Sequence, residues 1–143
     1  MEKKELLPYK RKAAYYETDQ MKIIHHSNYI RWFEETRVDM LEQMGVPYSL
    51  MEEKGIISPV LFVHCEYKTP VRFDDEVLIT GKIVSFTGLK FEVEYEIKDS
   101  KTGELRVTGK TGHCFVDENM IPLRLKKKFP DIYEVFESYV EKS

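Results

Sequence analysis

The sequence has little cysteine, and its cysteines are not arranged as a metal site. Cys65 and Cys114 lie inside predicted strands, and neither belongs to a CxxC pair or lies at ligand spacing from a histidine. We therefore expect buried, reduced thiols. His64 and His113 also occupy strand positions, and we interpret them as structural histidines, so no metal is inferred.

The sequence also lacks any long apolar stretch. The N-terminal residues MEKKELLPYKRK are charged, and no run approaches the roughly 18 apolar residues that a membrane-spanning helix needs. The 22 basic and 25 acidic residues give a net charge of −3 and form no broad positive field. We therefore expect no membrane span and no nucleic acid partner, and a cytoplasmic protein fits best.

Repeats, low-complexity tracts and Gly/Ser linkers that would divide the chain are absent as well. The 143 residues, of which 42% are apolar, are enough for one domain with an adequate core. The sequence therefore predicts a single domain over residues 1–143.

The sequence does contain a strongly amphipathic segment at residues 27–44. Apolar residues recur there at steps of three and four, with charged residues between them. The apolar positions are Tyr29, Trp32, Phe33, Thr36, Met40, Leu41 and Met44. Ser27 or Asn28 is expected to cap the start, and Gly45 to end the segment. This pattern predicts one long helix, with a shorter helical piece around residues 48–54.

After Gly55 the apolar period changes to two, which predicts strands. The alternation is cleanest at residues 89–98, where apolar and charged residues face opposite ways, so one face of the sheet is expected to be wet. The predicted strands cover about residues 9–17, 61–68, 76–86, 89–98 and 104–116. The links after residues 86 and 98 are too short for anything but antiparallel hairpins.

This order of elements predicts an α+β fold. We expect one curved antiparallel sheet of about five strands, wrapped around the long central helix, and a helical tail near residues 130–140. Such a sheet has open edges, so pairing with a second copy of the chain is physically reasonable.

Residues 15–29 gather the groups of a candidate active site. Asp19 lies just ahead of His25 and His26, Tyr15 lies four residues before Asp19, and the long helix begins next. A carboxylate can act there as a base or a nucleophile, and the N–H groups of a helix start can stabilise developing negative charge. A turn is expected to make the two imidazoles diverge, so that only His26 points into the site.

Residues 15–41, YYETDQMKIIHHSNYIRWFEETRVDML, resemble the N-terminal signature of hotdog-fold acyl-CoA thioesterases of the 4-hydroxybenzoyl-CoA thioesterase-like family. Residues 67–75, YKTPVRFDD, look like the family's proline-containing turn between strands. The last predicted strand also ends where the family's does. The resemblance covers about residues 10–125 and leaves a tail of about 126–143.

The resemblance implies a sheet rolled around the helix, a homodimer or homotetramer with active sites at the dimer interface, and no metal or cofactor beyond the CoA of the substrate. It matches Asp19 to the catalytic carboxylate, which attacks the thioester carbonyl or activates water. His26 and Tyr15 match assisting positions. The backbone N–H groups expected to hold the oxyanion lie around His26 to Tyr29, with Ser27, Asn28 and Tyr29 as the named candidates.

Other residues are expected to contact the substrate. The helix face that carries Tyr29, Trp32 and Phe33 is expected to line part of the acyl pocket. Arg72 and Lys90 are candidates for the CoA phosphates, because both are basic residues at predicted strand ends. The run of lysines at residues 126–128 is interpreted as a solvated helix end, with contact to CoA as the alternative.

One residue departs from the family pattern. Lys22 occupies the position three residues after Asp19, where the family usually has glycine. Glycine makes a left-handed backbone easy, so this loop is expected to be strained or differently shaped.

The sequence therefore favours an acyl-CoA thioester hydrolase. Two alternatives stay open: a module that binds acyl-CoA or acyl-carrier protein without catalysis, and a hotdog hydratase or dehydratase with an Asp/His pair. The position of Asp19 ahead of a helix favours hydrolysis over the hydratase.

Overall fold

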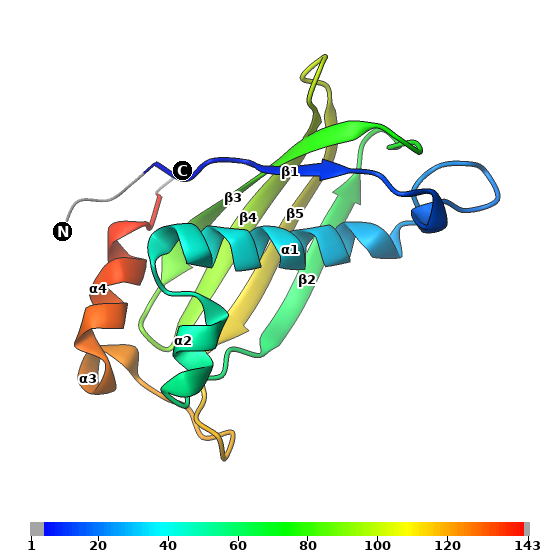
Figure 1. The fold of residues 1–143 in the computed structure, drawn as a ribbon. Coiled ribbons are helices and arrows are strands. Elements are labelled where there is room, and N and C mark those ends of the chain that lie inside the picture. The colour runs from blue at the N-terminus through cyan, green and yellow to red at the C-terminus, as the bar shows by residue number, and fades with distance from the viewer. Residues whose placement is uncertain (1–4, 142–143) are drawn as a thin grey trace.

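Five antiparallel strands form one curved sheet that wraps around the long helix α1 (Figure 1). The computed structural model describes residues 5–141, and the strand order is β1-β3-β4-β5-β2. The strands are β1 Tyr9–Lys12, β2 Val60–Tyr67, β3 Glu76–Phe86, β4 Lys90–Asp99 and β5 Leu105–Cys114. The helices are the 3-10 helix η1 Tyr15–Glu17, α1 Ser27–Met44, α2 Tyr48–Glu53, α3 Leu125–Lys128 and α4 Pro130–Ser138. The predicted α+β architecture is confirmed.

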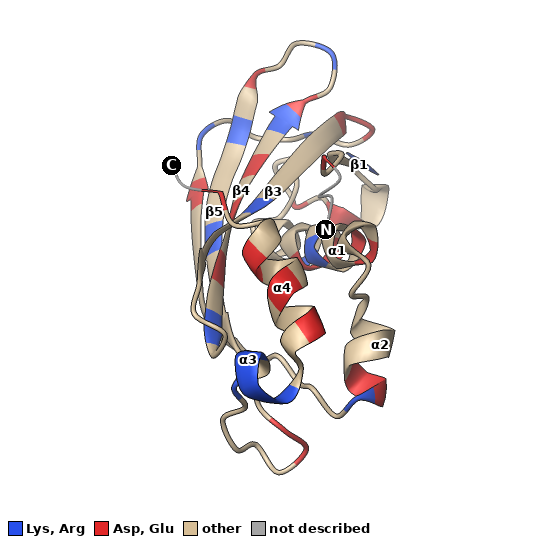
Figure 2. Ribbon diagram, turned by 90° about the vertical axis from the view of Figure 1, so that its left-hand side faces the viewer, with Lys and Arg blue, Asp and Glu red and all other residues tan. Residues whose placement is uncertain are grey.

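The alternation in β4 decides which face of the sheet meets α1. Phe91, Val93, Tyr95 and Ile97 are buried, whereas the charged residues between them are exposed or half-buried. Figure 2 shows these charges along β4 and β5. The expected wet face is confirmed. No helix within residues 5–141 is long and apolar enough to cross a bilayer.

The two ends of α1 differ in how well they were predicted. Gly45 ends the helix in the left-handed region at φ 84°, and its N–H donates to the Glu42 carbonyl at 3.1 Å, as expected. At the start, neither Ser27 nor Asn28 caps the helix through its side chain. The Ser27 hydroxyl bonds instead to the His25 imidazole, and the Asn28 amide donates to the Glu17 carbonyl. Both candidate capping side chains therefore bond to residues of the preceding loop and not to the N–H groups of the helix.

Phe33 joins α1 to the middle of the sheet. Its ring stacks on Tyr95 with centroids 4.4 Å apart, and it lies directly over Gly109. A Cβ at Gly109 would approach the Phe33 ring to 2.3 Å, so only glycine fits there. The apolar face of α1 can pack closely on β5 because Gly109 has no side chain.

The first strand is shorter than predicted. It ends at Lys12, and η1 replaces the expected extension to Glu17. The Glu17 carboxylate accepts the Ala14 N–H at 2.9 Å, and the Thr18 N–H donates to the Tyr15 carbonyl at 3.1 Å. These local bonds compete with the strand ladder and close a turn.

The two cysteines are free thiols, but the prediction that they are buried was wrong, because both are half-buried. Cys65 lies in β2, one of the two edge strands of the sheet, and Cys114 is the last residue of β5. Burial still raises the pKa of the Cys65 thiol.

The C-terminal helix was predicted near residues 130–140, and α4 at Pro130–Ser138 confirms it. Its Phe136 ring lies 5.3 Å from Phe91 and 5.4 Å from Phe115, so α4 packs on the sheet beside α1. Residues 142–143 of the expected tail lie outside the described residues.

A buried polar network lies between α1 and the sheet. Arg37 donates to the Tyr95 hydroxyl at 3.1 Å, and that hydroxyl bonds to Thr111 at 2.7 Å. Thr111 in turn bonds to His113 Nε2 at 2.8 Å. Burial first, and the charge of Arg37 second, lower the pKa of His113 to about 3. His113 is therefore held neutral in the folded chain.

We expect His113 to make the protein acid-sensitive. Its folded pKa lies below the ordinary 6.5, so between pH 6.5 and about 3 the unfolded chain binds one more proton than the folded chain. Stability should therefore fall as the pH falls through this window, by up to about 1.4 kcal/mol per pH unit. Denaturant unfolding of wild type and His113→Gln at several pH values checks this. Equal slopes for the two proteins would contradict it.

Candidate active site

Asp19 opens a tight turn that holds its carboxylate. The Asp19 N–H donates to the Ile23 carbonyl at 2.8 Å, and the Lys22 N–H donates back to the Asp19 carbonyl at 3.0 Å. The Met21 N–H donates to Asp19 Oδ1 at 2.8 Å. No described residue donates a hydrogen bond to Oδ2. One carboxylate oxygen is thus fixed, and the other is available to a reacting group.

Lys22 adopts the backbone conformation that glycine usually supplies. Its φ is 65°, in the left-handed region. This conformation costs a non-glycine residue of order 1 to 2 kcal/mol. The expected strain at this position is therefore present, and it lies in the turn that carries Asp19.

Glu17 holds this turn against the start of α1. It is not among the candidate residues predicted from the sequence. Its side chain is only 3% exposed, and its Oε2 accepts the Trp32 indole N–H at 2.9 Å and Arg11 Nη2 at 2.9 Å. The Glu17 carbonyl accepts the His25 N–H at 2.8 Å and the Asn28 side-chain amide at 3.0 Å. One buried residue thus joins β1, the loop and the start of α1.

The two histidines do not diverge as expected. The rings of His25 and His26 stack with centroids 4.2 Å apart. Only His26 lines the cavity described below, in agreement with the expected choice, because the Nδ1 of His25 is held at 2.9 Å from the Ser27 hydroxyl.

The N–H groups expected to hold an oxyanion are largely occupied. Ser27 N–H donates to the His25 imidazole at 3.2 Å, Asn28 N–H to the His25 carbonyl at 3.0 Å and Tyr29 N–H to the His26 carbonyl at 3.3 Å. The His26 N–H has no acceptor among residues 5–141. The free donor at the helix start is therefore the first of the expected group.

A cavity of about 330 Å³ lies between the Asp19 turn and the end of β2. Its lining is mostly apolar or aromatic, and Asp19, His26 and Lys68 are the acidic, imidazole and basic side chains in it. The full lining is Asp19, Met21, Ile23, Ile24, His26, Tyr29, Tyr67, Lys68, Thr69 and Pro70.

Two tyrosines form an aromatic wall of this cavity. Tyr67 lies 5.6 Å from Tyr29 and 6.3 Å from His26, measured between ring centroids. The Tyr29 hydroxyl accepts the Val71 N–H at 3.3 Å, which ties α1 to the segment after β2. Burial raises the pKa of Tyr29, and burial together with the hydrogen bond that the Tyr67 hydroxyl donates to the Cys65 sulfur raises the pKa of Tyr67 to about 12. Both phenols stay neutral at physiological pH.

The structure places the other predicted site residues elsewhere. Tyr15 is 71% exposed, with its ring against Phe73 at 5.5 Å, and does not line the cavity. Trp32 and Phe33 are fully buried in the core. Arg72 is exposed, but its backbone bridges to Ile23 in the Asp19 turn.

Lys90 lies at the far end of the sheet. It pairs with Cys114 at one end of β5, whereas Tyr67 of the cavity wall pairs with Val107 near the other end. Seven residues of strand separate these positions, or roughly 23 Å. Within one chain, Lys90 and the Asp19 cavity are therefore apart.

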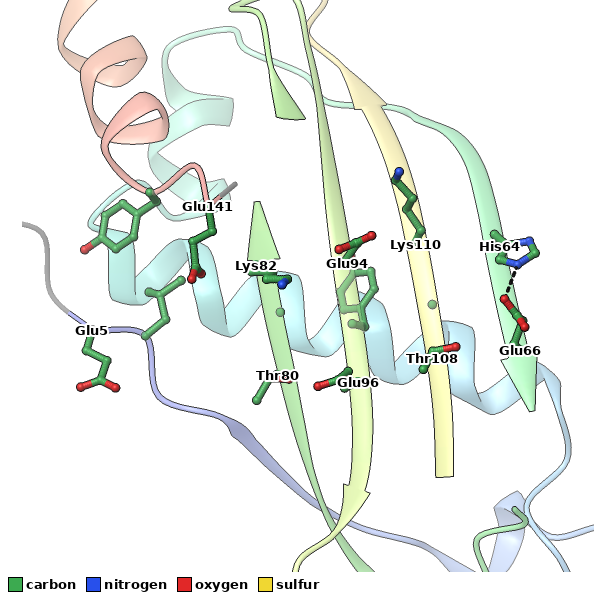
Figure 3. A pocket seen from close by; sticks show the side chains of 15 residues that line it. Glu5, His64, Glu66, Thr80, Lys82, Glu94, Glu96, Thr108, Lys110 and Glu141 are labelled. Carbon is green, nitrogen blue, oxygen red and sulfur yellow. Dashed lines mark hydrogen bonds and ion pairs between the residues drawn. The ribbon is translucent and has the colours of Figure 1, made fainter. Parts of the chain in front are cut away.

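A larger hollow of about 640 Å³ lies over the outer face of the sheet (Figure 3). Lysines alternate there with glutamates across the strands, and His64 pairs with Glu66 at 3.1 Å. Lys110 in turn pairs with Glu92, its neighbour in the same face, at 3.1 Å. The lining contains five glutamates and two lysines, so this open surface carries an excess of negative charge. The smaller cavity combines an apolar lining with a free carboxylate oxygen, so it is the better candidate for chemistry.

Comparisons with known proteins identify the family of the chain. The family model described as the thioesterase-like superfamily matches residues 14–136. YneP of Bacillus subtilis (strain 168), provisionally named an acyl-CoA thioesterase, is 35% identical over 126 residues, which cover 87% of this chain and 91% of YneP.

Solved structures are similar over nearly the whole chain. The DHNA-CoA thioesterase from Staphylococcus aureus superposes with a TM-score of 0.87 at 34% identity, covering 92% of this chain and 89% of that one. A hypothetical protein from Aquifex aeolicus superposes with a TM-score of 0.81 at 30% identity, covering 92% and 99%. The chain therefore belongs to the thioesterase-like superfamily, and the expected hotdog fold is confirmed.

Proposed function

We propose that the protein hydrolyses acyl-CoA thioesters to a free carboxylic acid and CoA, with Asp19 at the reacting centre. Family membership makes the chain a thioester hydrolase. The observation that carries the finer proposal is the apolar cavity in which Asp19, with a free Oδ2, lies with His26 at the start of α1. The names of the Bacillus and Staphylococcus relatives support a CoA thioester as substrate.

Two routes are open to the Asp19 carboxylate. As a nucleophile, its free oxygen bonds to the thioester carbon, the carbon–sulfur bond breaks, and CoA leaves as thiolate; water then hydrolyses the mixed anhydride. As a general base, Asp19 takes a proton from water, the hydroxide adds to the same carbon, and the proton is passed to the departing sulfur. Both routes yield one acid and one thiol for each water consumed.

The start of α1 supports either route. Its positive end and the free N–H of His26 favour the negative charge that develops on the carbonyl oxygen. The His26 imidazole lines the same cavity and is suited to orient the attacking water. Tyr29 and Tyr67 offer aromatic surface to the acyl group.

A panel of acyl-CoA substrates tests the proposal, with aliphatic chains of several lengths and hydroxylated aromatic acyl groups. Release of free thiol on at least one of them, with the free acid as product, supports it. Binding without thiol release would identify a binding module. Hydration or dehydration of an enoyl or hydroxyacyl thioester without thiol release would identify a hydratase.

We also propose that two copies pair through β2. This edge strand has apolar side chains exposed on both faces: Val60 48%, Leu61 51%, Phe62 41%, Val63 39% and Tyr67 51%. An edge of this kind is a template for another strand. Tyr67 belongs both to this edge and to the cavity, so the partner would lie beside the site.

Charges on the β2 edge are therefore expected to break the dimer. The double variant Leu61→Lys, Val63→Lys places like charges opposite one another across a two-fold interface. Light scattering should show a dimer or larger assembly for wild type and mainly monomer for this variant, with loss of activity. Leu7→Lys, Val38→Lys is the matched control, since both residues are exposed apolar residues away from β2. A monomeric wild type with full activity would contradict the proposal.

Two earlier expectations stay predictions. One is the cytoplasmic location. The other is catalysis without a metal or a bound cofactor.

A further inference from the structure

Arg106, in β5, holds the segment that follows β2 through both its backbone and its side chain. The Arg106 carbonyl accepts the N–H groups of Lys68 at 2.8 Å and Thr69 at 3.0 Å. Its guanidinium Nη1 donates to the Pro70 carbonyl at 3.1 Å. The Thr69 hydroxyl adds a bond to the Leu105 carbonyl at 3.0 Å. These four bonds fix the segment to the start of β5.

This segment forms one wall of the Asp19 cavity. We call residues 68–72 the strap. Lys68, Thr69 and Pro70 line the cavity, whereas Arg106 is not part of the lining that residues 5–141 provide. Arg106 therefore supports the wall without lining the cavity itself.

The other end of the strap holds the turn that carries Asp19. The Val71 carbonyl accepts the Ile24 N–H at 2.8 Å. Arg72 forms a backbone bridge with Ile23, and the Ile23 carbonyl accepts the Asp19 N–H at 2.8 Å. A continuous series of hydrogen bonds thus connects Arg106, through the strap, to the reacting carboxylate's own turn.

Asp99 fixes the guanidinium of Arg106 from the side of the β4–β5 hairpin. Its Oδ2 accepts Arg106 Nη2 at 2.9 Å, and the Arg106 and Asp99 side chains are only 16% and 12% exposed. Its Oδ1 accepts the N–H groups of Lys101 at 2.8 Å and Thr102 at 3.0 Å. The hydrogen bonds from Thr102, Arg106 and Lys101 lower the pKa of Asp99 to about 2. The Asp99 carboxylate is therefore charged at physiological pH.

The planar fork of arginine suits this position. One terminal nitrogen bonds to the Pro70 carbonyl in the strap and pairs with Glu104 at 2.8 Å, and the other bonds to Asp99. A guanidinium can hold partners on two sides in a fixed geometry, which a lysine ammonium cannot do. The β4–β5 hairpin projects at the end of the sheet where β2 ends, so its carboxylates lie behind the strap (Figure 1).

We propose that Arg106 is a positioning residue of the thioesterase site: anchored by Asp99, it holds the strap, and through the strap the Asp19 turn, in the reactive geometry. This rests on the proposed function. Arg106 touches no reacting atom in this role. Its effect on rate follows because a displacement of about 1 Å at a reacting group can cost up to about a hundredfold in turnover.

The first test removes the side-chain contact to the strap. Arg106→Gln should lower kcat for acyl-CoA hydrolysis by about tenfold, with KM changed by less than about threefold. Arg106→Lys keeps the charge but not the fork, so it should recover part of this loss. The control is Lys110→Gln, which removes one cation and one ion pair from the same strand and should change kcat by less than about twofold. An Arg106→Gln variant with the kcat of wild type would overturn the proposal.

The second test acts on the anchor and leaves Arg106 in place. Asp99→Asn keeps an oxygen for the N–H groups of the hairpin turn but presents an amide N–H to the guanidinium where Oδ2 now accepts it. We expect kcat to fall by about fivefold, although Asp99 lies outside the cavity lining. In the double variant with Arg106→Gln, the two losses should not add, because both break one chain of contacts. Additive losses would mean that Asp99 does not act through Arg106.

Hydrogen exchange separates positioning from general stabilisation. In Arg106→Gln, the N–H groups of the strap and of the Asp19 turn should exchange at least about tenfold faster than in wild type, and those of α4 should keep their rates. Equal acceleration in all segments, or no change in the strap, would overturn the proposal. Wild type that releases no thiol would refute the proposed function, whereas an active wild type with an equally active Arg106→Gln would refute only the role of Arg106.

Discussion

Replacing Asp19 by Asn is expected to lower the turnover of acyl-CoA hydrolysis by at least about a hundredfold, the scale typical of a positioned acid–base group. Asparagine keeps the size of the side chain and an oxygen that can accept the Met21 N–H at the position where Asp19 Oδ1 accepts it now. It removes the negative charge that both routes need. The turn and the cavity should therefore persist while the chemistry stops.

The measurement is steady-state thiol release, with binding of the acyl-CoA and the melting temperature followed in the same variant. We expect binding and melting temperature close to wild type. His26→Ala and Tyr15→Phe are useful comparisons. His26 lines the cavity, so His26→Ala should lower turnover, but by less than Asp19→Asn. Tyr15 is exposed, so Tyr15→Phe should lower turnover least. If Asp19→Asn turns over within a fewfold of wild type, Asp19 does not carry the reaction.

The elements that could be predicted from the sequence are those with strong local periodicity. The helix expected at residues 27–44 is α1 at Ser27–Met44, and the strand expected at 76–86 is β3 at Glu76–Phe86. Spacing, a stop signal and alternation are all encoded within a few residues of where they act. The loop around Asp19 could be identified as a candidate site for the same reason, because its residues are close together in the sequence.

What the sequence could not predict depends on contacts between distant residues. Tyr67 reaches the cavity because the segment after β2 bridges to the Asp19 turn through Arg72 and Ile23. The sequence contains no signal for this pairing of Ile23 with Arg72, apart from the YKTP segment, which begins at Tyr67. The occupied N–H groups at the start of α1 were missed for the same reason, since their acceptors come from the way the loop turns back on itself.

Glu17 is the clearest case of a residue that local patterns conceal. In the sequence it is one acid among 25 acidic residues, in a polar loop where a solvated side chain is the usual outcome. Its burial follows from Arg11, six residues before it, and Trp32, fifteen residues after it. Arg11 also bonds to Glu35 at 2.8 Å and lies 5.2 Å from the Trp32 ring centroid. The positive charge of Arg11 and the hydrogen bond from the Trp32 indole N–H together offset the cost of burying the Glu17 carboxylate.

Glu17→Ala is therefore expected to destabilise the fold by about 3 kcal/mol. It leaves the Trp32 indole N–H unpaired in the core and removes one of the two carboxylates that bond to Arg11. Arg11 still bonds to Glu35, so the loss of stability should lie in the lower part of the range for a broken buried ion pair. Denaturant unfolding measures it, with Glu34→Ala on the exposed side of α1 as control, for which a change within about 0.5 kcal/mol is expected.

The same variant should also impair catalysis, because Glu17 positions the loop that carries Asp19 and His26. Measured well below its melting temperature, Glu17→Ala should lose about tenfold in kcat, as is typical when supporting contacts of a site are removed. A double-mutant cycle with Trp32→Phe separates the indole bond from the rest, and coupling of about 1 kcal/mol or more is expected if the bond is made in solution. Additive effects in the cycle, or a Glu17→Ala variant as stable as Glu34→Ala, would mean that the carboxylate is solvated and that the Asp19 turn is held by its backbone bonds alone.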